Sequence, residues 1–297
     1  MKPPRSYTEK ISPTVGMNGY SIMDFEQYLF PPRVAIVEVA GQIGARINPR
    51  ELSRTFNSIA ENPRYPAVVL DIDSPGGGAA ASEALYLAAK RLSDKKPVAA
   101  AIRGVGASGG YMIACAANPI FALPTSVVGS IGVIWTAPMI SEALDRVGVK
   151  MRTRAAGEYK DMGSLFRENT PEEDQKLDAL IHSVYERFVD IVAEGRPDLE
   201  RDRVAELASG EIHTGAEAHE LGLVDQLGDL SDAIEWVADA AGIEKRTTLV
   251  RPKRGLLQML MTQGADSLAN ALVDSFIERV DAARSERLLE ARMRINR

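Results

Sequence analysis

Ser108 is the residue whose sequence context best fits a catalytic nucleophile. It lies in the segment Gly106-Ala-Ser-Gly-Gly110, directly after a strand-like run and directly before a helix-like run. The small residues around it allow the backbone to turn sharply and a substrate to approach closely. A serine at the start of a helix also lies beside free backbone N–H groups, which can hold the oxyanion of an acyl-transfer intermediate. The alternative is a serine that only caps the helix.

A second glycine-rich turn follows an earlier strand-like run. The segment Ser74-Pro-Gly-Gly-Gly78 ends the apolar run at 67–73, and parallel α/β sheets place their ligand crevices at such strand ends. Consecutive glycines expose backbone N–H groups and leave room for an extended peptide. A phosphate-binding turn is the alternative, but no lysine follows at P-loop spacing and the GxGxxG pattern is absent. We therefore expect this turn and the Ser108 turn to converge on one site.

A serine nucleophile needs a base that removes its proton. The three histidines lie far downstream of Ser108, and surface or packing roles suit them better: His182, His213 and His219. A lysine can act instead when burial keeps its amine neutral. Lys160, in Gly157-Glu-Tyr-Lys-Asp161, is the candidate, although its local sequence is also that of an ordinary surface lysine.

Composition and charge narrow the class of protein. Of the 297 residues, 45% are hydrophobic and 26% are charged, which is typical of a soluble globular chain. A net charge of −6 argues against nucleic acid as a partner, because phosphate binding needs a concentrated basic surface. The one cysteine, Cys115, lies among apolar residues, so we expect a buried and unreactive thiol. No feature calls for a metal or another cofactor.

Two observations bear on membranes. Residues 104–141 carry no charge, but their prolines and glycines would interrupt a spanning helix, so we expect several buried core elements instead. The first residues contain no apolar signal-peptide core and no anchor, so we expect a cytoplasmic protein. A basic amphipathic stretch near the C-terminus is expected to pack on its own or a neighbouring subunit, or else to contact a membrane surface peripherally.

Strand-like and helix-like segments alternate along the chain, which predicts βαβ units and a mainly parallel α/β sheet. Strands are expected at 33–40, 67–73, 98–103, 120–123, 130–135 and 149–154. Helices are expected at 49–62, 80–92, 140–147, 171–194, 201–208 and 230–241. Residues 1–32 are expected to form an N-terminal arm, residues 33–245 the main domain and residues 246–297 a helical C-terminal tail.

Over roughly residues 34–245 the chain resembles the signal peptide peptidase A family of Ser–Lys proteases, peptidase family S49. Five motifs in the family's order, with a step of 52 residues from the serine to the lysine, make the match specific. They are Asp73-Ser-Pro-Gly-Gly-Gly78, Gly106-Ala-Ser-Gly-Gly-Tyr111, Gly129-Ser-Ile-Gly-Val133, Gly157-Glu-Tyr-Lys-Asp161 with Arg167-Glu-Asn-Thr-Pro-Glu-Glu173, and Thr214-Gly-Ala-Glu-Ala218 with Leu221-Gly-Leu-Val-Asp225 and Leu227-Gly228. The resemblance implies the ClpP/crotonase fold, with repeated ββα units around the sheet.

The resemblance also implies a role for each matching residue. Ser108 matches the family's nucleophile and Lys160 its general base. Ser130 matches a serine that hydrogen-bonds the lysine and keeps its lone pair directed at the nucleophile. The backbone N–H groups that correspond to the oxyanion hole belong to Gly109 and to Gly77 or Gly76. The uncharged stretch is then expected to desolvate the lysine, while three nearby carboxylates are expected to point away from it: Asp73, Glu158 and Asp161.

The implied activity is hydrolysis of peptides or signal-peptide-like fragments through an acyl-enzyme. The family tends to form homo-oligomeric rings, and in some members the serine and lysine of one site come from different subunits. Many relatives begin with a membrane anchor, whereas none is seen here. This departure favours a soluble or peripherally bound peptidase over one that cleaves remnants within the membrane.

Three alternatives stand beside the Ser–Lys peptidase. A crotonase-type acyl-CoA enzyme shares the fold but would need acidic residues at its active-site turns. A ClpP-type protease would need a histidine near residues 131–134, which read Ile-Gly-Val-Ile. A catalytically inactive scaffold that binds peptides is the third, and the intact set of Ser108, Ser130 and Lys160 argues against it.

Overall fold

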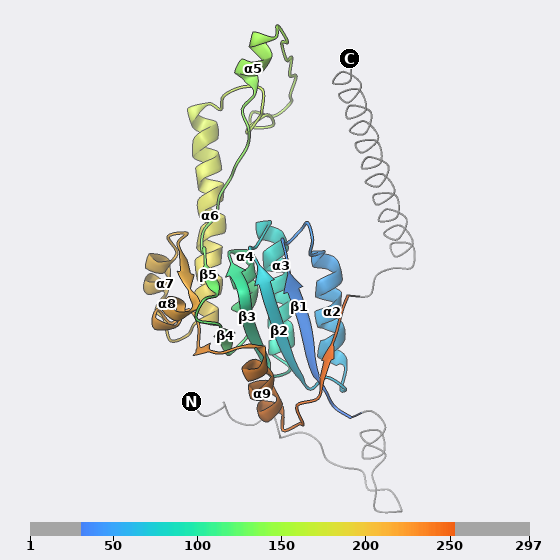
Figure 1. Cartoon of the computed structure of the whole chain (residues 1–297). Coiled ribbons are helices and arrows are strands. Elements are labelled where there is room, and N and C mark those ends of the chain that lie inside the picture. Colours follow the sequence, from blue (N-terminus) through green and yellow to red (C-terminus); the bar gives the residue numbers. More distant parts are fainter. Residues whose placement is uncertain (1–30, 253–297) are drawn as a thin grey trace, which may run out of the picture. The chain divides into compact units, whose positions relative to one another are not determined.

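The computed structural model describes residues 31–252, in which helices pack on both faces of one sheet (Figure 1). The strands are β1 (Val34–Ala40), β2 (Ala67–Ser74), β3 (Val98–Ala107), β4 (Ile120–Ala122), β5 (Val127–Gly129), β6 (Ile212–Thr214), β7 (Gln226–Leu227) and β8 (Thr247–Leu249). Their order is β6-β5-β3-β2-β1-β8, while β4 pairs with both β3 and β7. All pairs are parallel except β5 with β6, so the expected mainly parallel α/β sheet is confirmed.

Several of the helices begin at residues whose side chains cap them. They are α2 (Pro49–Glu61), α3 (Ala79–Ser93), α4 (Gly109–Ala114), α5 (Ser141–Arg146), α6 (Pro171–Gly195), α7 (Arg201–Leu207), α8 (Gly215–Glu220) and α9 (Leu230–Ala241). The Asn48 side chain accepts hydrogen bonds from the first N–H groups of α2. Thr170 and Glu173 form the reciprocal capping box of α6. These caps fix the starts of two helices that the sequence predicts.

Side chains of successive strand residues alternate between two apolar layers. On one face, Leu70 and Ile72 of β2 pack in the large core with side chains from α2, α3, α4 and α6. On the other face, Val69 packs in a smaller cluster with Val237 of α9. The middle strands are therefore buried on both sides, which is typical of a parallel sheet with helices on its two faces.

Two strand predictions are wrong. Residues 130–135 and 149–154 form no strand, although a real strand, β5, ends directly before residue 130. Strands need a neighbour with which to exchange hydrogen bonds, and the chain leaves the sheet directly after β5. The expected helix at 140–147 is confirmed as α5. Most of the expected arm and tail lies outside residues 31–252, and β8, within the expected tail range, pairs with β1.

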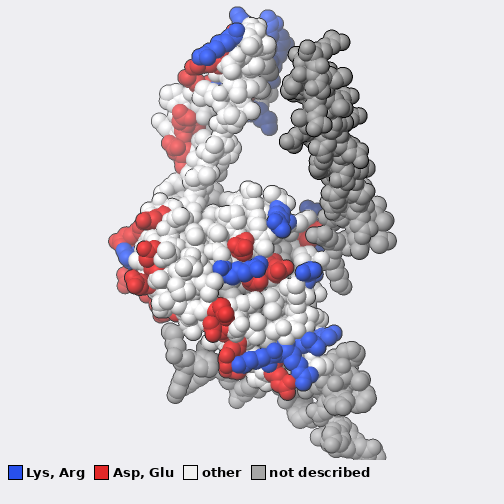
Figure 2. All heavy atoms as spheres, viewed as in Figure 1, with Lys and Arg blue, Asp and Glu red and all other residues white. Residues whose placement is uncertain are grey.

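We call residues 131–170 the projecting segment. Figure 1 shows that it runs away from the sheet beside α6, carries α5 and then returns to the start of α6. Ile134 is 90% exposed and Trp135 is 55% exposed, and further large apolar side chains of the segment face solvent: Met139, Val147, Val149 and Met151. Figure 2 shows basic side chains at its outer end. A segment with this much exposed apolar surface has the character of an interaction surface.

The prediction for Cys115 is confirmed. The thiol is buried at the end of α4, and its burial raises the pKa of Cys115 to about 12. Thiolate formation is therefore suppressed, and the residue packs as a small hydrophobe. Within the described part of the chain, no helix is both long enough and apolar enough to span a membrane.

The end of α6 is held to the sheet by a buried arginine. Arg196 Nη1 lies 2.7 Å from Asp225 Oδ2, and the same oxygen accepts a hydrogen bond from the Ile120 N–H at the start of β4. Arg196 Nε also donates to the Gly195 carbonyl. Because the guanidinium is buried, its loss would leave part of this polar cluster without a partner.

We therefore expect Arg196→Met to lower the free energy of unfolding by about 3 kcal/mol, the usual cost of breaking a buried ion pair. The matched control is Arg201→Met, which removes exposed ion pairs with Glu186 and Asp190 and should cost about 0.5 kcal/mol. Urea denaturation of both variants measures the difference. Equal losses would contradict the structural role of Arg196.

Candidate active site

The glycine-rich turns and the candidate serines meet at one edge of the sheet. Ser74, the last residue of β2, pairs in register with Gly106 of β3, and Ala107 pairs with Gly129 at the end of β5. Because these strands are parallel, the residues that follow them leave the sheet at the same edge. The convergence of the two turns that the sequence predicts is confirmed.

An irregularity in β3 shapes this edge. From the Ile72 pair to the Ser74 pair, β2 advances by two residues while β3 advances from Ile102 to Gly106, by four. Asp73 Oδ1 accepts a hydrogen bond from the Val105 N–H within this irregular stretch. Bulged pairing of this kind changes the direction in which a strand ends and is common beside active sites. The Asp73 carboxylate is thus engaged with β3.

Ser108 has a conformation that serine rarely adopts. Its φ is 51° and its ψ is −123°, and its N–H donates to the Gly129 carbonyl over 2.8 Å. Its carbonyl accepts from the Met112 N–H, so the residue opens α4. However, its side chain makes no helix-capping hydrogen bond. The Ser108 side chain therefore does not cap the helix, which was the structural alternative for this residue.

The second glycine-rich turn lies directly against Ser108. A Cβ added to Gly76 would lie 2.6 Å from the Gly109 nitrogen and 2.8 Å from the Ser108 Cβ. Gly76 also has a φ of 92°, which favours glycine. A Cβ on Gly77 would meet the Ile43 carbonyl oxygen at 2.1 Å. Backbone approaches this close are open only to glycine, and they place the two turns in contact.

The donor groups of this turn are not equivalent. The Gly76 N–H donates to Ser74 Oγ over 3.2 Å, and that hydroxyl in turn donates to the Gly41 carbonyl. The Gly76 N–H is therefore already engaged within the fold. Two N–H groups of this turn are expected oxyanion donors, those of Gly76 and Gly77. Because the Gly76 N–H is engaged, the Gly77 N–H remains the candidate.

Ser130 shares the unusual backbone of Ser108. Among the described residues, positive φ at a non-glycine position occurs only at these two serines, each with a φ of 51°. The Ser130 N–H donates to the Glu211 carbonyl over 2.7 Å. The residue before it, Gly129, accepts the hydrogen bond from Ser108. Strained backbone that the surrounding fold holds in place is typical of functional sites.

Lys160 is not brought to this edge within the single chain. It lies in a turn of the projecting segment, where its N–H donates to the Gly157 carbonyl, and its side chain is exposed. Across residues 31–252, no hydrogen bond joins its amine to Ser108 or Ser130. The expected desolvation of Lys160 by the uncharged stretch is accordingly not present in the isolated chain.

The histidines are placed differently from one another. His182 is an exposed residue of α6, 3.6 Å from Glu186, and His219 contacts the Val224 carbonyl. His213, in contrast, lies on β6 beside Gly129, where a Cβ on that glycine would meet the His213 ring at 3.2 Å. Sequence patterns do not reveal this neighbour, because β6 is a three-residue strand that pairs across a long sequence separation. Among the described side chains, no cluster of His, Cys, Asp and Glu could hold a metal ion.

Known proteins are similar in sequence to this chain over much of its length. The model of peptidase family S49 matches residues 90–244. A putative protease of Synechocystis is 38% identical over 247 residues, which cover 82% of this chain and 87% of that protein. The chloroplastic serine protease SPPA of Arabidopsis thaliana is 34% identical over 249 residues, or 78% of this chain and 37% of that protein.

A further relative, protease 4 of Salmonella typhi, is 35% identical over 186 residues, which cover 62% of this chain and 30% of that protein. The chain thus spans most of the cyanobacterial relative and about a third of the two longer ones. The family range contains Ser108, Ser130 and Lys160. The chain belongs to peptidase family S49, the family of signal peptide peptidase A.

Proposed function

We propose that this peptidase is a serine endopeptidase that cleaves peptides through an acyl-enzyme on Ser108, with Lys160 as its general base. The observation that carries this proposal is the meeting of two glycine-rich turns and two positive-φ serines at one sheet edge. A crotonase-type acyl-CoA enzyme would need acidic groups at this edge, and Asp73 is instead hydrogen-bonded to β3. A peptide-binding scaffold without activity remains the alternative that the experiments below test.

The proposed reaction follows from the roles of the backbone and side-chain groups. Ser108 Oγ attacks the peptide carbonyl while the neutral Lys160 amine takes the hydroxyl proton. The N–H groups of Gly109 and Gly77 hold the oxyanion that forms. Lys160 then returns the proton to the leaving amine, and water hydrolyses the acyl-enzyme by the reverse sequence. Ser130 hydrogen-bonds the lysine and keeps its lone pair directed at Ser108.

The position of Lys160 supports a site shared between two copies of the chain. In one chain the lysine is exposed on the projecting segment, which Figure 1 shows running away from the sheet. The same segment exposes large apolar side chains, including Ile134, Trp135 and Val147, which need a partner surface to be buried. We propose that the protein is a homo-oligomeric ring in which the projecting segment of one copy delivers Lys160 to Ser108 of its neighbour. That contact would also remove the amine from water.

The proposed substrates are peptides in extended conformation, including signal-peptide-like fragments. The turn at Gly76 and Gly77 has no side chains to obstruct a strand-like backbone, so a peptide can lie against the sheet edge. The protease names of the relatives support the substrate class. The choice of fragment is inferred by analogy with the family.

The first prediction concerns the two reacting side chains. With a panel of fluorogenic peptides, Ser108→Ala should lower kcat/KM by roughly 10⁴-fold or more, and Lys160→Ala by roughly 10²-fold or more. Lys150→Ala, which removes an exposed lysine of the same segment, should retain most of the activity. Wild-type rates in both active-site variants would show that the dyad assignment is wrong.

The pH dependence tests the identity of the base. Because only the neutral amine accepts the serine proton, kcat/KM should fall as the pH falls and Lys160 becomes protonated. His213 lies near the site, and histidine is the most common general base in enzymes. His213→Asn should therefore keep the same acid limb as wild type, whereas loss of that limb in the variant would assign it to the histidine.

The glycine at position 76 provides a test of the oxyanion hole. Gly76→Ala places a methyl group 2.6 Å from the Gly109 nitrogen, so it should block that donor and lower kcat by roughly 10²-fold. The matched control is Gly78→Ala, whose methyl group would meet only the Ala81 Cβ at 3.9 Å. Circular dichroism measures whether each variant keeps the secondary structure of wild type. Equal activity in the two variants would remove Gly109 from the proposed site.

Mixing the two inactive variants tests whether the site is shared. If Ser108 and Lys160 come from different copies, Lys160→Ala chains supply the serine and Ser108→Ala chains supply the lysine. Subunit exchange should then restore about a quarter of wild-type activity through random pairing in a symmetric ring. Mixtures of either variant with itself provide the control. A mixture that stays inactive although mass spectrometry detects mixed oligomers would place both residues in one chain.

A further inference from the structure

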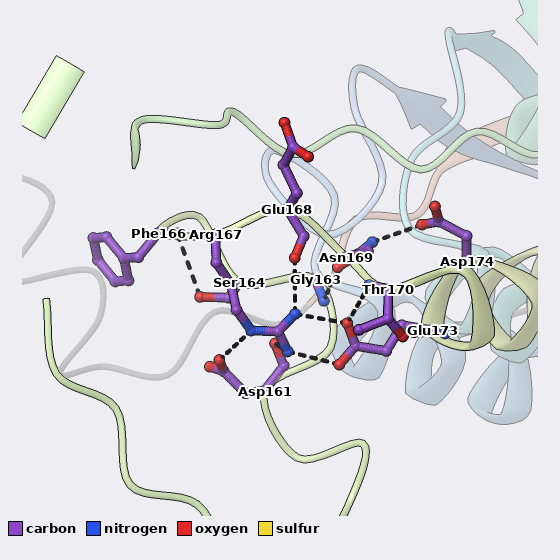
Figure 3. A network of polar contacts seen from close by, with 10 residues as sticks. All are labelled: Asp161, Gly163, Ser164, Phe166, Arg167, Glu168, Asn169, Thr170, Glu173 and Asp174. Atoms are coloured by element: carbon purple, nitrogen blue, oxygen red, sulfur yellow. Dashed lines mark hydrogen bonds and ion pairs between the residues drawn. The ribbon is translucent and has the colours of Figure 1, made fainter. Parts of the chain in front are cut away.

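Arg167 is the centre of a polar network that includes Asp161, the residue that follows Lys160 (Figure 3). Its Nε donates to Asp161 Oδ2 over 2.8 Å, and its Nη2 donates to the Asp161 carbonyl over 3.0 Å. The two terminal nitrogens bind both oxygens of Glu173, at 2.7 and 2.6 Å. Nη1 also donates to the Glu168 carbonyl. One guanidinium therefore joins two carboxylates and two backbone carbonyls, which only arginine can do with this geometry.

The Glu173 end of the network is a fixed point. Glu173 lies in the first turn of α6, where its side chain accepts from the Thr170 N–H and its own N–H donates to Thr170 Oγ1. Its side chain is buried, and its bonds to Arg167 and to the Thr170 N–H lower the pKa of Glu173 to about 2. The carboxylate therefore stays ionised over the working pH range, and it holds Arg167 at the N-terminus of α6.

The Asp161 end of the network is the turn that carries the proposed base. Asp161 directly follows Lys160, and both its carboxylate and its carbonyl are bound by Arg167. A second link runs in parallel, because the Gly163 N–H donates to Asn169 Oδ1 over 3.0 Å. Asn169 in turn donates to Asp174 in the first turn of α6. Two connections thus fix the turn at 157–164 to the start of a long, regular helix.

Among the charged groups around this turn, Asp161 is the carboxylate that could most directly affect the protonation of the Lys160 amine. Glu158 precedes Lys160 and interacts with the Tyr159 hydroxyl. From α6, Lys176 Nζ lies 5.2 Å from the centre of the Tyr159 ring, Glu172 acts on the same tyrosine at longer range, and Glu173 is bound to Arg167. Asp161 is adjacent to Lys160 and would be free to turn toward the amine if its partner were removed. A carboxylate beside an amine favours the ammonium form, which cannot act as a base.

We propose that Arg167 is a positioning residue that fixes the Lys160 turn to α6 and keeps the Asp161 carboxylate away from the Lys160 amine. This inference rests on the proposed role of Lys160 as the base. It gives Arg167 two effects that can be measured separately. If Arg167 anchors the turn, its loss should lower kcat at every pH. If Arg167 holds the Asp161 carboxylate, its loss should change only the pH at which the Lys160 amine becomes neutral.

The test is a double-mutant cycle between Arg167 and Asp161, measured as pH profiles of kcat and KM in the full chain. Arg167→Gln should lower kcat roughly tenfold near neutral pH and move the acid limb up by about 1 pH unit. Adding Asp161→Asn to that variant should return the limb to its wild-type position while kcat stays reduced. Asp161→Asn alone should leave the limb in place, because Arg167 already engages the carboxylate.

Two further variants keep the result interpretable. Arg167→Lys retains the charge but cannot bind both carboxylates in this geometry, so it should show a smaller shift of the same sign, and it replaces Arg167→Gln if that variant does not fold. Arg201→Gln is the matched control, since Arg201 also binds two carboxylates, Glu186 and Asp190, and its profile should match wild type.

The outcomes separate this inference from the proposed function. If Arg167→Gln lowers kcat equally at all pH values, or if Asp161→Asn does not reverse the shift, Arg167 does not hold the Asp161 carboxylate away from the Lys160 amine. If Arg167→Gln leaves kcat unchanged at every pH, Arg167 does not anchor the turn. If the Lys160→Ala variant is as active as wild type, Lys160 is not the base and the proposed function is wrong. The Lys160→Ala result therefore shows which of the two claims has failed.

Discussion

The close approach of backbone at the ends of β2, β3 and β5 is the constraint on which the rest of the site depends. A single hydrogen bond from the Ser108 N–H to the Gly129 carbonyl closes the edge between β3 and β5. The Gly76 turn fills the space on the other side, so closely that no side chain fits there. Ser108 is thus held with positive φ by neighbours on both sides. The fold sustains this strain because the parallel register brings three strand ends together.

The second half of the proposed machinery lies on a different part of the fold. The projecting segment leaves the sheet directly after β5, and α6 supports it through the Arg167 network. The sheet edge and the Lys160 turn are therefore each rigidly built, but on separate elements. In the proposed shared site, catalysis would depend on assembly, because neither half could remove the serine proton alone. Assembly would also bury the apolar side chains that the segment exposes in one chain.

The core of the fold and the meeting of the two glycine-rich turns could be predicted from sequence because their signals are local. Apolar runs followed by glycines identify β2 and β3, and the glycine pairs themselves mark the turns that must approach each other. The prediction of a strand at 149–154 was wrong because exposed apolar residues are a feature of protein interfaces as well as of strands. The apolar pattern alone does not distinguish the two. The short strands β6 and β7 were missed because two or three residues carry no periodic signal. Arg167 belonged to a recognisable motif, but its bonds to Asp161 and Glu173 became visible only in three dimensions.

The most direct test of the central claim is covalent labelling of the nucleophile. The protein is treated with a serine-directed fluorophosphonate, and the site and rate of modification are followed by mass spectrometry. The account predicts a single adduct on Ser108, formed roughly 10²-fold more slowly in Lys160→Ala than in wild type because the base is missing. An adduct on another residue, or a rate that does not depend on Lys160, would contradict it.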